Sequence, residues 1–213
     1  MITTHQFLPL YPIDPTSRKL IVGTIHPHDH GNFRVPFFYG NRGSIWSILH
    51  EAFPKELPDP FSRDAILAFL KDRKISMSDV VVECRRKTPT ALDSDLIPTK
   101  LNFAMVEEIR NSLINEIYFT SGFGTNNAFK LFFVDILRQK LTKEIIARKE
   151  FSLGPEIFGR TIRLSALISP AGTGNISLSK SKIYLENRHK YTNSSRPVQD
   201  FKVDYYKKIF SVL

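Results

Sequence analysis

The chain has 213 residues, 42% of them hydrophobic and 24% charged, a composition typical of a folded globular protein and not of a disordered one. Thirty lysines and arginines against 21 acidic residues leave a formal charge of +9. This excess indicates a polyanionic partner, most often nucleic acid and less often a membrane surface, with a solubilising surface as the alternative. The single cysteine, Cys84, excludes an intrachain disulfide, a Cys-ligated iron–sulfur cluster and a cysteine-rich zinc site.

The length and the N-terminus favour one domain without a targeting segment. We predict a single domain over 1–213, because the chain is long enough for one proper core and short for two. The N-terminus lacks the basic start and long apolar stretch of a signal peptide, and no apolar run approaches the roughly 18 to 20 residues of a membrane span. We therefore expect a cytoplasmic monomer that does not associate with membranes.

The predicted elements alternate between strands and helices. Residues 19–23, KLIVG, form a short apolar run suited to a buried strand, and the histidine-rich segment GTIHPHDHG (23–31) follows it directly. In chain order we then expect helices over 44–53 and 62–71, strands over 79–84 and 116–121, a helix over 122–139, a strand over 160–168 and a helix over 199–210. Ser62 is expected to cap the second of these helices.

This alternation indicates a parallel sheet with helices on both faces. We predict an α/β fold of three layers, α/β/α, around a short, mainly parallel four-stranded sheet. In such sheets, ligands bind beyond the carboxyl ends of the strands. The segments 23–31 and 168–175 (ISPAGTGN) both follow such ends, which makes them candidate site segments.

The least regular part of the chain, residues 177–196, is basic. Lysines and arginines stand between tyrosines there, a mixture suited to phosphate contact and base stacking, with a solvated surface loop as the alternative. Its basic residues are Lys180, Lys182, Arg188, Lys190 and Arg196, and the tyrosines are Tyr184 and Tyr191.

The histidine-rich segment is suited to a metal site, a catalytic loop or a solvated turn. His26, His28 and His30 alternate, and Asp29 adds an oxygen ligand, as a zinc site would need. Pro27 stiffens the segment, however, and no second cluster supplies the remaining ligand, so we expect neither a metal nor a cofactor. The chain also lacks a G-x-S-x-G motif, a Walker loop and a G-x-G-x-x-G motif after its first strand.

Four further segments complete a longer pattern. They are, in order, VPFFYGNRGSIWSIL (35–49), VVECRRKTPTALDSDL (81–96), IYFTSGFGTNNAFKLF (117–132) and LISPAGTGNIS (167–177). Together with GTIHP, this set resembles the uracil-DNA glycosylase superfamily, nearest to the mismatch-specific uracil/thymine and the hypoxanthine-DNA glycosylases. The resemblance covers roughly residues 20–177 and the last helix, and it implies the same α/β/α fold.

The resemblance assigns catalytic roles to the first loop. The pair His26-Pro27 falls on the Asn-Pro or Asp-Pro of the family's first motif, whose polar residue positions the attacking water. His26 is therefore the candidate for this role, with His28 and Asp29 in support or as alternatives. A neutral imidazole can accept a proton from water near neutral pH.

The resemblance also places base-binding and DNA-binding residues. Phe38 falls on the aromatic residue that stacks on the extruded base. Gly43 stands where these relatives carry an asparagine, so Asn41 becomes the candidate reader of the base edge, while Trp46 matches a tryptophan of the core. The remaining candidates are Gly23 and Thr24 for the base, Gly172, Thr173, Gly174 and Asn175 for a wedge in the DNA, and Lys180 and Lys182 for phosphates.

Several of these assignments have a purely structural alternative. His28 and His30 are equally suited to a solvated turn, and Phe38 to the core. Asp93 and Ser94 match a family loop near the base, and they are as well suited to cap the segment that follows.

The activity implied is hydrolysis of the N-glycosidic bond of a damaged or mispaired base, of uracil or hypoxanthine type, flipped out of DNA. Such an enzyme needs a positioned water and donors aimed at the leaving base, and no metal or covalent nucleophile. DNA is then the expected partner. Two alternatives remain: a catalytically inactive nucleic-acid-binding protein of the same fold, which the replaced asparagine favours, and a hydrolase of a free nucleotide or nucleoside.

Overall fold

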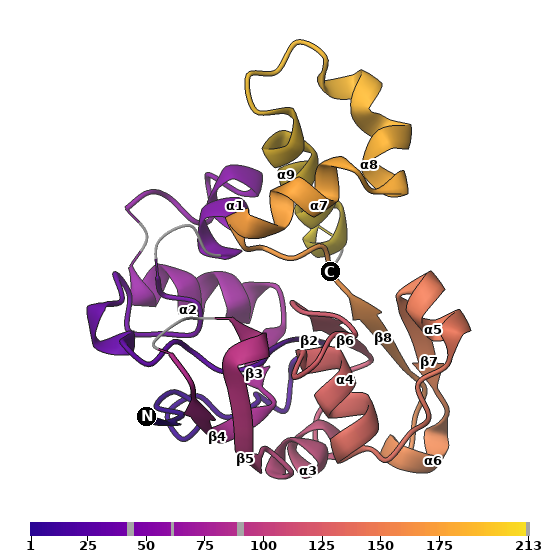
Figure 1. The fold of residues 1–213 in the computed structure, drawn as a ribbon. Coiled ribbons are helices and arrows are strands. Elements are labelled where there is room, and N and C mark those ends of the chain that lie inside the picture. Colours follow the sequence, from indigo (N-terminus) through magenta and orange to yellow (C-terminus); the bar gives the residue numbers. More distant parts are fainter. Residues whose placement is uncertain (42–44, 61, 89–91, 212–213) are drawn as a thin grey trace. The chain divides into compact units, whose positions relative to one another are not determined.

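The computed structural model describes residues 1–41, 45–60, 62–88 and 92–211. Within it the chain forms two compact units, the first from residues 1–31 and 74–167 and the second from residues 32–73 and 168–213 (Figure 1). A single domain over 1–213 stays a prediction. The position of Gly43 lies outside the described residues.

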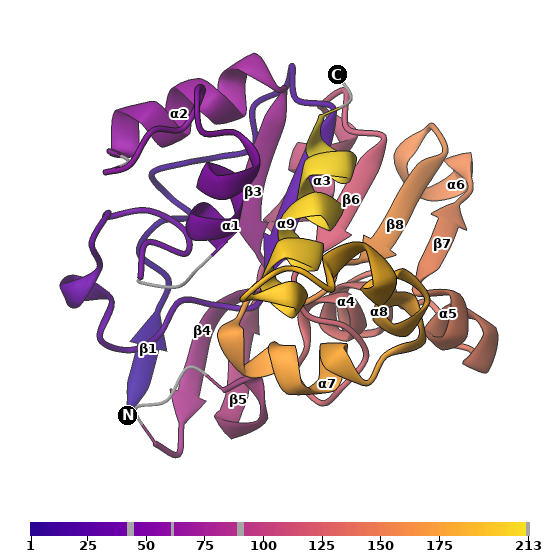
Figure 2. The same ribbon diagram turned by 90° about the horizontal axis from the view of Figure 1, so that it is seen from above.

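A five-stranded, mainly parallel sheet forms the core of the first unit. Its strands lie in the order β3–β2–β6–β8–β7, and only β7 runs antiparallel to its neighbour (Figure 2). The bounds are β2 (Lys19–Gly23), β3 (Ile75–Asp79), β6 (Glu116–Phe119), β7 (Glu150–Leu153) and β8 (Ile162–Ala166). The predicted α/β class with a mainly parallel sheet is confirmed, with five strands in place of the four expected.

The predicted strand over 79–84 is wrong, because the chain changes sheets within it. Asp79 ends β3, and the next strand joins a separate antiparallel sheet with the order β1–β4–β5. At the change, the N–H of Val80 donates to the carbonyl of Gly23 (3.0 Å). This small sheet consists of β1 (Ile2–Thr4), β4 (Val81–Arg86) and β5 (Leu96–Leu101). The valines that follow Asp79 are therefore apolar because the chain is buried where it passes from one sheet to the other, and not because they belong to one continuous strand.

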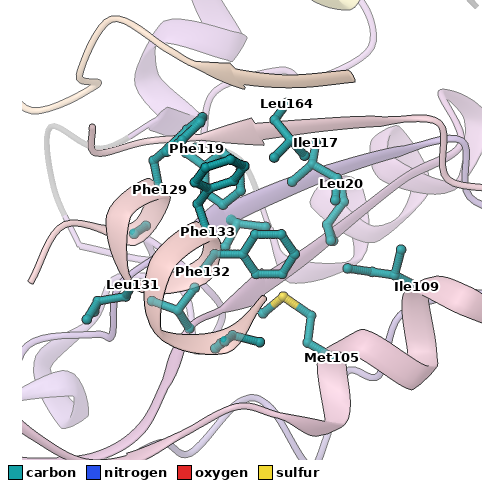
Figure 3. Close-up of a cluster of buried hydrophobic side chains, with 14 of the residues drawn as sticks. Leu20, Met105, Ile109, Ile117, Phe119, Phe129, Leu131, Phe132, Phe133 and Leu164 are labelled. Carbon is teal, nitrogen blue, oxygen red and sulfur yellow. The ribbon is translucent and has the colours of Figure 1, made fainter. Parts of the chain in front are cut away.

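Alternate residues of the parallel strands build one hydrophobic core with the helices of the first unit. Leu20, Ile117 and Leu164 are in register on β2, β6 and β8 and are fully buried, so they lie on the same face of the sheet. They pack in one cluster with Phe132 and Met105 of two helical segments (Figure 3). The helical elements of this unit are α3 (Ala104–Arg110), α4 (Ala128–Lys130), η3 (Leu131–Ile136), α5 (Lys143–Arg148) and α6 (Pro155–Phe158), with the short η2 (Asp93–Asp95) before β5.

The helix expected over 122–139 begins later and ends earlier than predicted. It starts as α4 at Ala128, whose N–H donates to the side chain of Ser121 (2.8 Å), and continues as the π-helical η3 to Ile136. The residues before it form a turn in which Asn126 adopts a left-handed backbone with φ of 60°. The glycines at 122 and 124 make such a turn favourable over an earlier helix start.

Truncation of Phe132 to alanine should lower the free energy of unfolding by about 3–5 kcal/mol, because the ring is fully buried and lies 5.4 Å from the ring of Phe119. Chemical denaturation followed by circular dichroism measures the change. Phe103→Ala is the matched control, since its side chain is 54% exposed and its loss should cost less than about 1 kcal/mol. Equal losses for both variants would contradict this account of the core.

The second unit is helical, and its two N-terminal helices are as predicted. The helix expected over 44–53 is α1 (Ile45–Ala52), and that over 62–71 is α2 (Arg63–Asp72). Ser62 caps α2, because its hydroxyl accepts the N–H of Ala65 (3.1 Å). The one-turn η1 (His30–Asn32) lies where the chain passes from the first unit to the second.

The C-terminal part of the second unit is more regular than predicted. Residues 177–196, expected to be irregular, contain the end of one helix and two further helical segments, and the last helix begins at Pro197 instead of 199. The elements are η4 (Gly172–Gly174), α7 (Asn175–Ser179), α8 (Lys182–Asn187), η5 (Arg188–Tyr191) and α9 (Pro197–Phe210). Among the described residues, no helix is both long and apolar enough to span a bilayer.

Candidate functional site

Two hydroxyl groups meet at the carboxyl ends of adjacent parallel strands in the first unit. Thr24 follows β2 directly, and Ser121 comes two residues after β6. Their side-chain oxygens lie 3.2 Å apart, because β2 and β6 are hydrogen-bonded neighbours in the sheet. This edge is where parallel α/β sheets bind ligands.

A half-buried carboxylate, Asp93, is the third member of this polar cluster. The Thr24 hydroxyl donates to Oδ2 of Asp93 (3.0 Å), the first residue of η2. The side-chain amide of Asn126 donates to the carbonyl of Asp93 (3.1 Å) and to that of Leu96 (2.7 Å), which fixes the segment against the turn after β6. Oriented with its oxygen toward the N–H of Gly122, the Asn127 amide also donates to Asp93 Oδ2 (3.2 Å).

The surroundings of Asp93 change its acidity. The pKa of Asp93 is raised to about 6, mainly because the carboxyl is buried. The hydrogen bonds from Thr24 and Ser121 act in the opposite direction, and the negative charge of Asp79 adds to the rise. A carboxylate with this pKa is ionised at pH 7 to 8 and accepts a proton more readily than an ordinary aspartate does.

A second carboxylate, Asp79, lies at the end of β3, in register with Gly23 of β2. Nε2 of His5 lies 2.8 Å from Oδ2 of Asp79, within hydrogen-bond distance. Since Nδ1 of His5 accepts the main-chain N–H groups of Phe7 and Leu8 (3.1 Å each), the imidazole hydrogen must lie on Nε2 and is donated to Asp79. The ring is thereby fixed in one tautomer and one orientation.

The other oxygen of Asp79 has no donor. Oδ1 is buried and makes no hydrogen bond with any residue that the structure describes. An unmet buried acceptor costs about 1–3 kcal/mol. A donor N–H that reaches Oδ1 would recover this free energy.

His26, the predicted water-positioning residue, is engaged on both ring nitrogens. Nδ1 donates to the carbonyl of Pro27 (2.7 Å), and Nε2 accepts the N–H of Gln6 (3.1 Å). The side chain is buried, and burial lowers the pKa of His26 to about 4, so the ring is neutral. Its catalytic role stays a prediction, and these hydrogen bonds do not favour it, because a water would have to displace a main-chain partner.

The other polar residues of the loop lie at the surface. His28 is exposed, and its Nδ1 lies 2.9 Å from the hydroxyl of Thr3, while Asp29 is exposed as well. The ring of His30 lies 4.4 Å from that of His26. Within the described ranges, no three histidine, cysteine or acidic side chains are grouped as a metal ion requires.

The predicted base-stacking residue, Phe38, belongs to the second unit and is buried. Its carbonyl accepts the indole N–H of Trp46 (2.7 Å), and its ring packs edge-to-face on Phe37 at 5.2 Å. The turn that carries it requires Gly40, since a Cβ there would lie 1.7 Å from the carbonyl oxygen of Val35. Trp46 is fully buried, so its predicted core role is confirmed.

The predicted reader of the base edge, Asn41, and the predicted DNA-contacting residues also belong to the second unit. Asn41 is exposed, as are Gly172 and Thr173 of η4, whereas Gly174 and Asn175 are half-buried. Lys180 is exposed, and Lys182 lies 3.7 Å from Glu186 on the same helix. Ile176, which was not among the predicted residues, is 73% exposed in the first turn of α7.

Two residues of this region, Asp79 and Ser121, were not among the predicted site residues. A signal for them exists, because each lies at or just beyond the carboxyl end of a parallel strand, as the chosen Thr24 does. Asp79 was taken as the first residue of the strand expected over 79–84, whereas it is the last residue of β3. Asp93 was noted beside Ser94 but not chosen, since its burial depends on contacts distant in sequence.

No protein-family model matches the chain, and no curated protein does. A solved structure does match: the solution structure of a protein from Methanosarcina acetivorans described as a "putative Uracil DNA glycosylase". The two chains share 17% sequence identity and superpose with a TM-score of 0.52 over 98% of this chain and 99% of the other. The fold that the sequence motifs implied is therefore confirmed.

Proposed function

We propose that the protein is a DNA glycosylase that hydrolyses the N-glycosidic bond of a uracil- or hypoxanthine-type base flipped out of DNA. The observation that carries the proposal is the half-buried carboxylate of Asp93, with its pKa near 6, hydrogen-bonded to Thr24 at the carboxyl edge of the sheet. The fold of the matching structure and the formal charge of +9 support it, since DNA is a polyanion.

In this proposal Asp93 acts as the general base. Cleavage of the C–N bond builds positive charge on the sugar and leaves the bonding electron pair on the base. A water oxygen forms the new bond to the sugar carbon, and one water proton passes to the Asp93 carboxylate. The hydroxyl of Thr24 orients the carboxylate, and the amide of Asn126 holds the main-chain carbonyl of the same residue, which is the positioning that this chemistry needs.

Asp79 supplies recognition of the base in the same proposal. Its free Oδ1 accepts an N–H from the base edge, and His5 holds the other oxygen so that the carboxylate does not rotate. Uracil and hypoxanthine both carry a ring N–H next to a carbonyl, whereas cytosine and adenine lack a hydrogen on the corresponding nitrogen. Asp79 thus favours uracil over cytosine and hypoxanthine over adenine, the bases from which they arise by deamination.

The test of this function is cleavage of labelled oligonucleotides that carry uracil, hypoxanthine, xanthine or a G·T mismatch, with alkali to reveal abasic sites. Wild type and His26→Ala are compared at low and moderate salt. We expect strand breaks with wild type on at least one of the deaminated bases, and breaks that persist in His26→Ala. If the breaks vanish in His26→Ala, His26 and not Asp93 positions the attacking water. No breaks on any substrate, with DNA binding retained, would favour the inactive binding protein.

Ile176 extends the predicted wedge of residues 172–175 with an apolar side chain. An exposed isoleucine is suited to insert between base steps, which stabilises a flipped-out nucleotide. We expect Ile176→Ala to lower cleavage of a duplex substrate about tenfold and to leave cleavage of the single-stranded substrate within about twofold. Ile183→Ala, on α8 with 40% exposure, is the matched control. An equal loss on both substrates would argue against a wedge.

A further inference from the structure

A lysine is buried beneath the exposed segment that leads into η4. Lys202 of α9 is fully buried, and its Nζ donates to the carbonyl of Ala171 (3.2 Å). Among the residues that the structure describes, this is the one hydrogen bond of the ammonium group, and no carboxylate lies within ion-pair distance of it. The charge of Lys202 is therefore buried without a counter-ion in this part of the chain.

A second side chain of α9 holds the same segment. Tyr206, one helical turn after Lys202, donates its buried hydroxyl to the carbonyl of Ile168 (2.7 Å). The two side chains thus fasten carbonyls three residues apart on one side of the segment. The other side is open, because Ala171, Gly172 and Thr173 are all exposed.

Burial of an ammonium group costs more free energy than a single hydrogen bond to a carbonyl recovers. Transfer of an unpaired charge from water into a protein costs several kcal/mol on the usual order-of-magnitude estimate, whereas a neutral donor makes the same hydrogen bond at a small fraction of that cost. Burial accordingly lowers the pKa of Lys202. The hydroxyl of Tyr206 shows that α9 can hold a carbonyl of this segment without a charge. The charge is explained if an anion binds on the exposed side.

We propose that Lys202 is a positioning residue for a DNA phosphate: it holds the segment 168–174 through Ala171, and its positive charge stabilises a phosphate bound to the exposed face of that segment at residues 171–173. The inference rests on the proposed function in that DNA is the ligand. It adds a phosphate site whose cation lies beneath the surface, in contrast to the exposed lysines 180 and 182. The interaction is poorly screened by salt at short range, because the ammonium is out of water.

Three substitutions separate the charge from the hydrogen bond. Lys202→Gln keeps a donor for the Ala171 carbonyl without the charge, Lys202→Met removes both, and Lys202→Arg keeps the charge. Tyr206→Phe is the matched control, since it removes the other carbonyl contact of α9 and changes no charge. Binding of a fluorescein-labelled undamaged duplex is measured by anisotropy, cleavage of the best substrate gives kcat and KM, and thermal unfolding is followed for every variant.

We expect Lys202→Gln and Lys202→Met to raise Kd and KM about tenfold, while kcat at saturating DNA stays within about twofold of wild type. Lys202→Arg should keep most of the wild-type affinity. Tyr206→Phe should bind DNA within about twofold of wild type. Wild-type affinity in Lys202→Gln would overturn the proposal. A rise in Kd for Tyr206→Phe as large as that for Lys202→Met would also overturn it, because Lys202 would then only anchor the segment.

If Lys202→Met does not fold, the Kd values of Lys202→Gln and Lys202→Arg are compared instead. If the wild type cleaves no base, the proposed function fails, yet the Kd values still decide the role of Lys202.

Discussion

Asp93→Asn should lower kcat for base removal about 100- to 10,000-fold, which is the range in which a positioned general base contributes. The asparagine can still accept the hydrogen bond from Thr24 but cannot take a proton from water. In wild type the base must be ionised, so log kcat should rise with pH through about 6 and then level off. The asparagine variant should show no such rise. Single-turnover cleavage between pH 5 and 8 measures both effects.

Stability distinguishes this loss from unfolding. The pKa of Asp93 in the folded protein, about 6, lies above the ordinary value of about 3.9 for the unfolded chain. The folded state therefore binds more protons between these values, and stability falls as the pH rises through this window. Because Asp93 is partly exposed, the cost at pH 7.5 is about 1–2 kcal/mol, and Asp93→Asn should unfold at an equal or higher temperature.

Asp95→Asn is the control for this substitution. Asp95 lies on the same short η2 and accepts the hydroxyl of Thr88 (2.7 Å), away from the cluster of Thr24 and Ser121. Its kcat should stay within about threefold of wild type. A kcat for Asp93→Asn equal to that of Asp95→Asn, or a matching fall in unfolding temperature, would remove Asp93 from the proposed mechanism.

Asp79→Asn should lower kcat/KM for uracil or hypoxanthine about 100-fold, because it places a donor where the base needs an acceptor. The asparagine oxygen keeps the hydrogen bond from His5, so the amide nitrogen takes the place of the free Oδ1. Binding of undamaged duplex should stay within about twofold of wild type. Steady-state cleavage and anisotropy on the same preparations measure the two quantities.

The conservative nature of this change makes the result informative. Asn102 donates to the main-chain carbonyl of Asp79 (3.1 Å), a contact that the side-chain substitution leaves in place. The variant also removes a buried charge, so its unfolding temperature should not fall. Unchanged kcat/KM on the deaminated bases would mean that Asp79 does not contact the base.

Local patterns predicted the elements well where neighbours in sequence decide the structure. The apolar run 19–23 is β2, and the capping serine at 62 starts α2 as expected. The order of the motifs likewise indicated the fold that the matching structure shares. The amphipathic edge strand β7 was not predicted, because its pairing with β8 depends on a chain reversal and not on its own four residues.

Non-local contacts decided the candidate site. The histidines of 23–31 were predicted to act as a group, yet both ring nitrogens of His26 are hydrogen-bonded to main-chain atoms, one of them to Gln6, 20 residues earlier in the chain. Asp93 receives its hydrogen bond from Thr24 across 69 residues, and Asp79 is held by His5 across 74. The partners of each pair are too far apart in the sequence for a local pattern to reveal the contact.

By itself, then, the sequence determined the class of fold, the polar segment at the end of the first strand, and the basic character that points to a polyanion. These features follow from periodicity and composition, which are local or summed properties. The tertiary structure alone decided which polar groups are buried, which tautomer His5 adopts, and which carboxylate has its pKa raised. Burial and hydrogen bonding set these properties, and both depend on which distant segments the fold brings together.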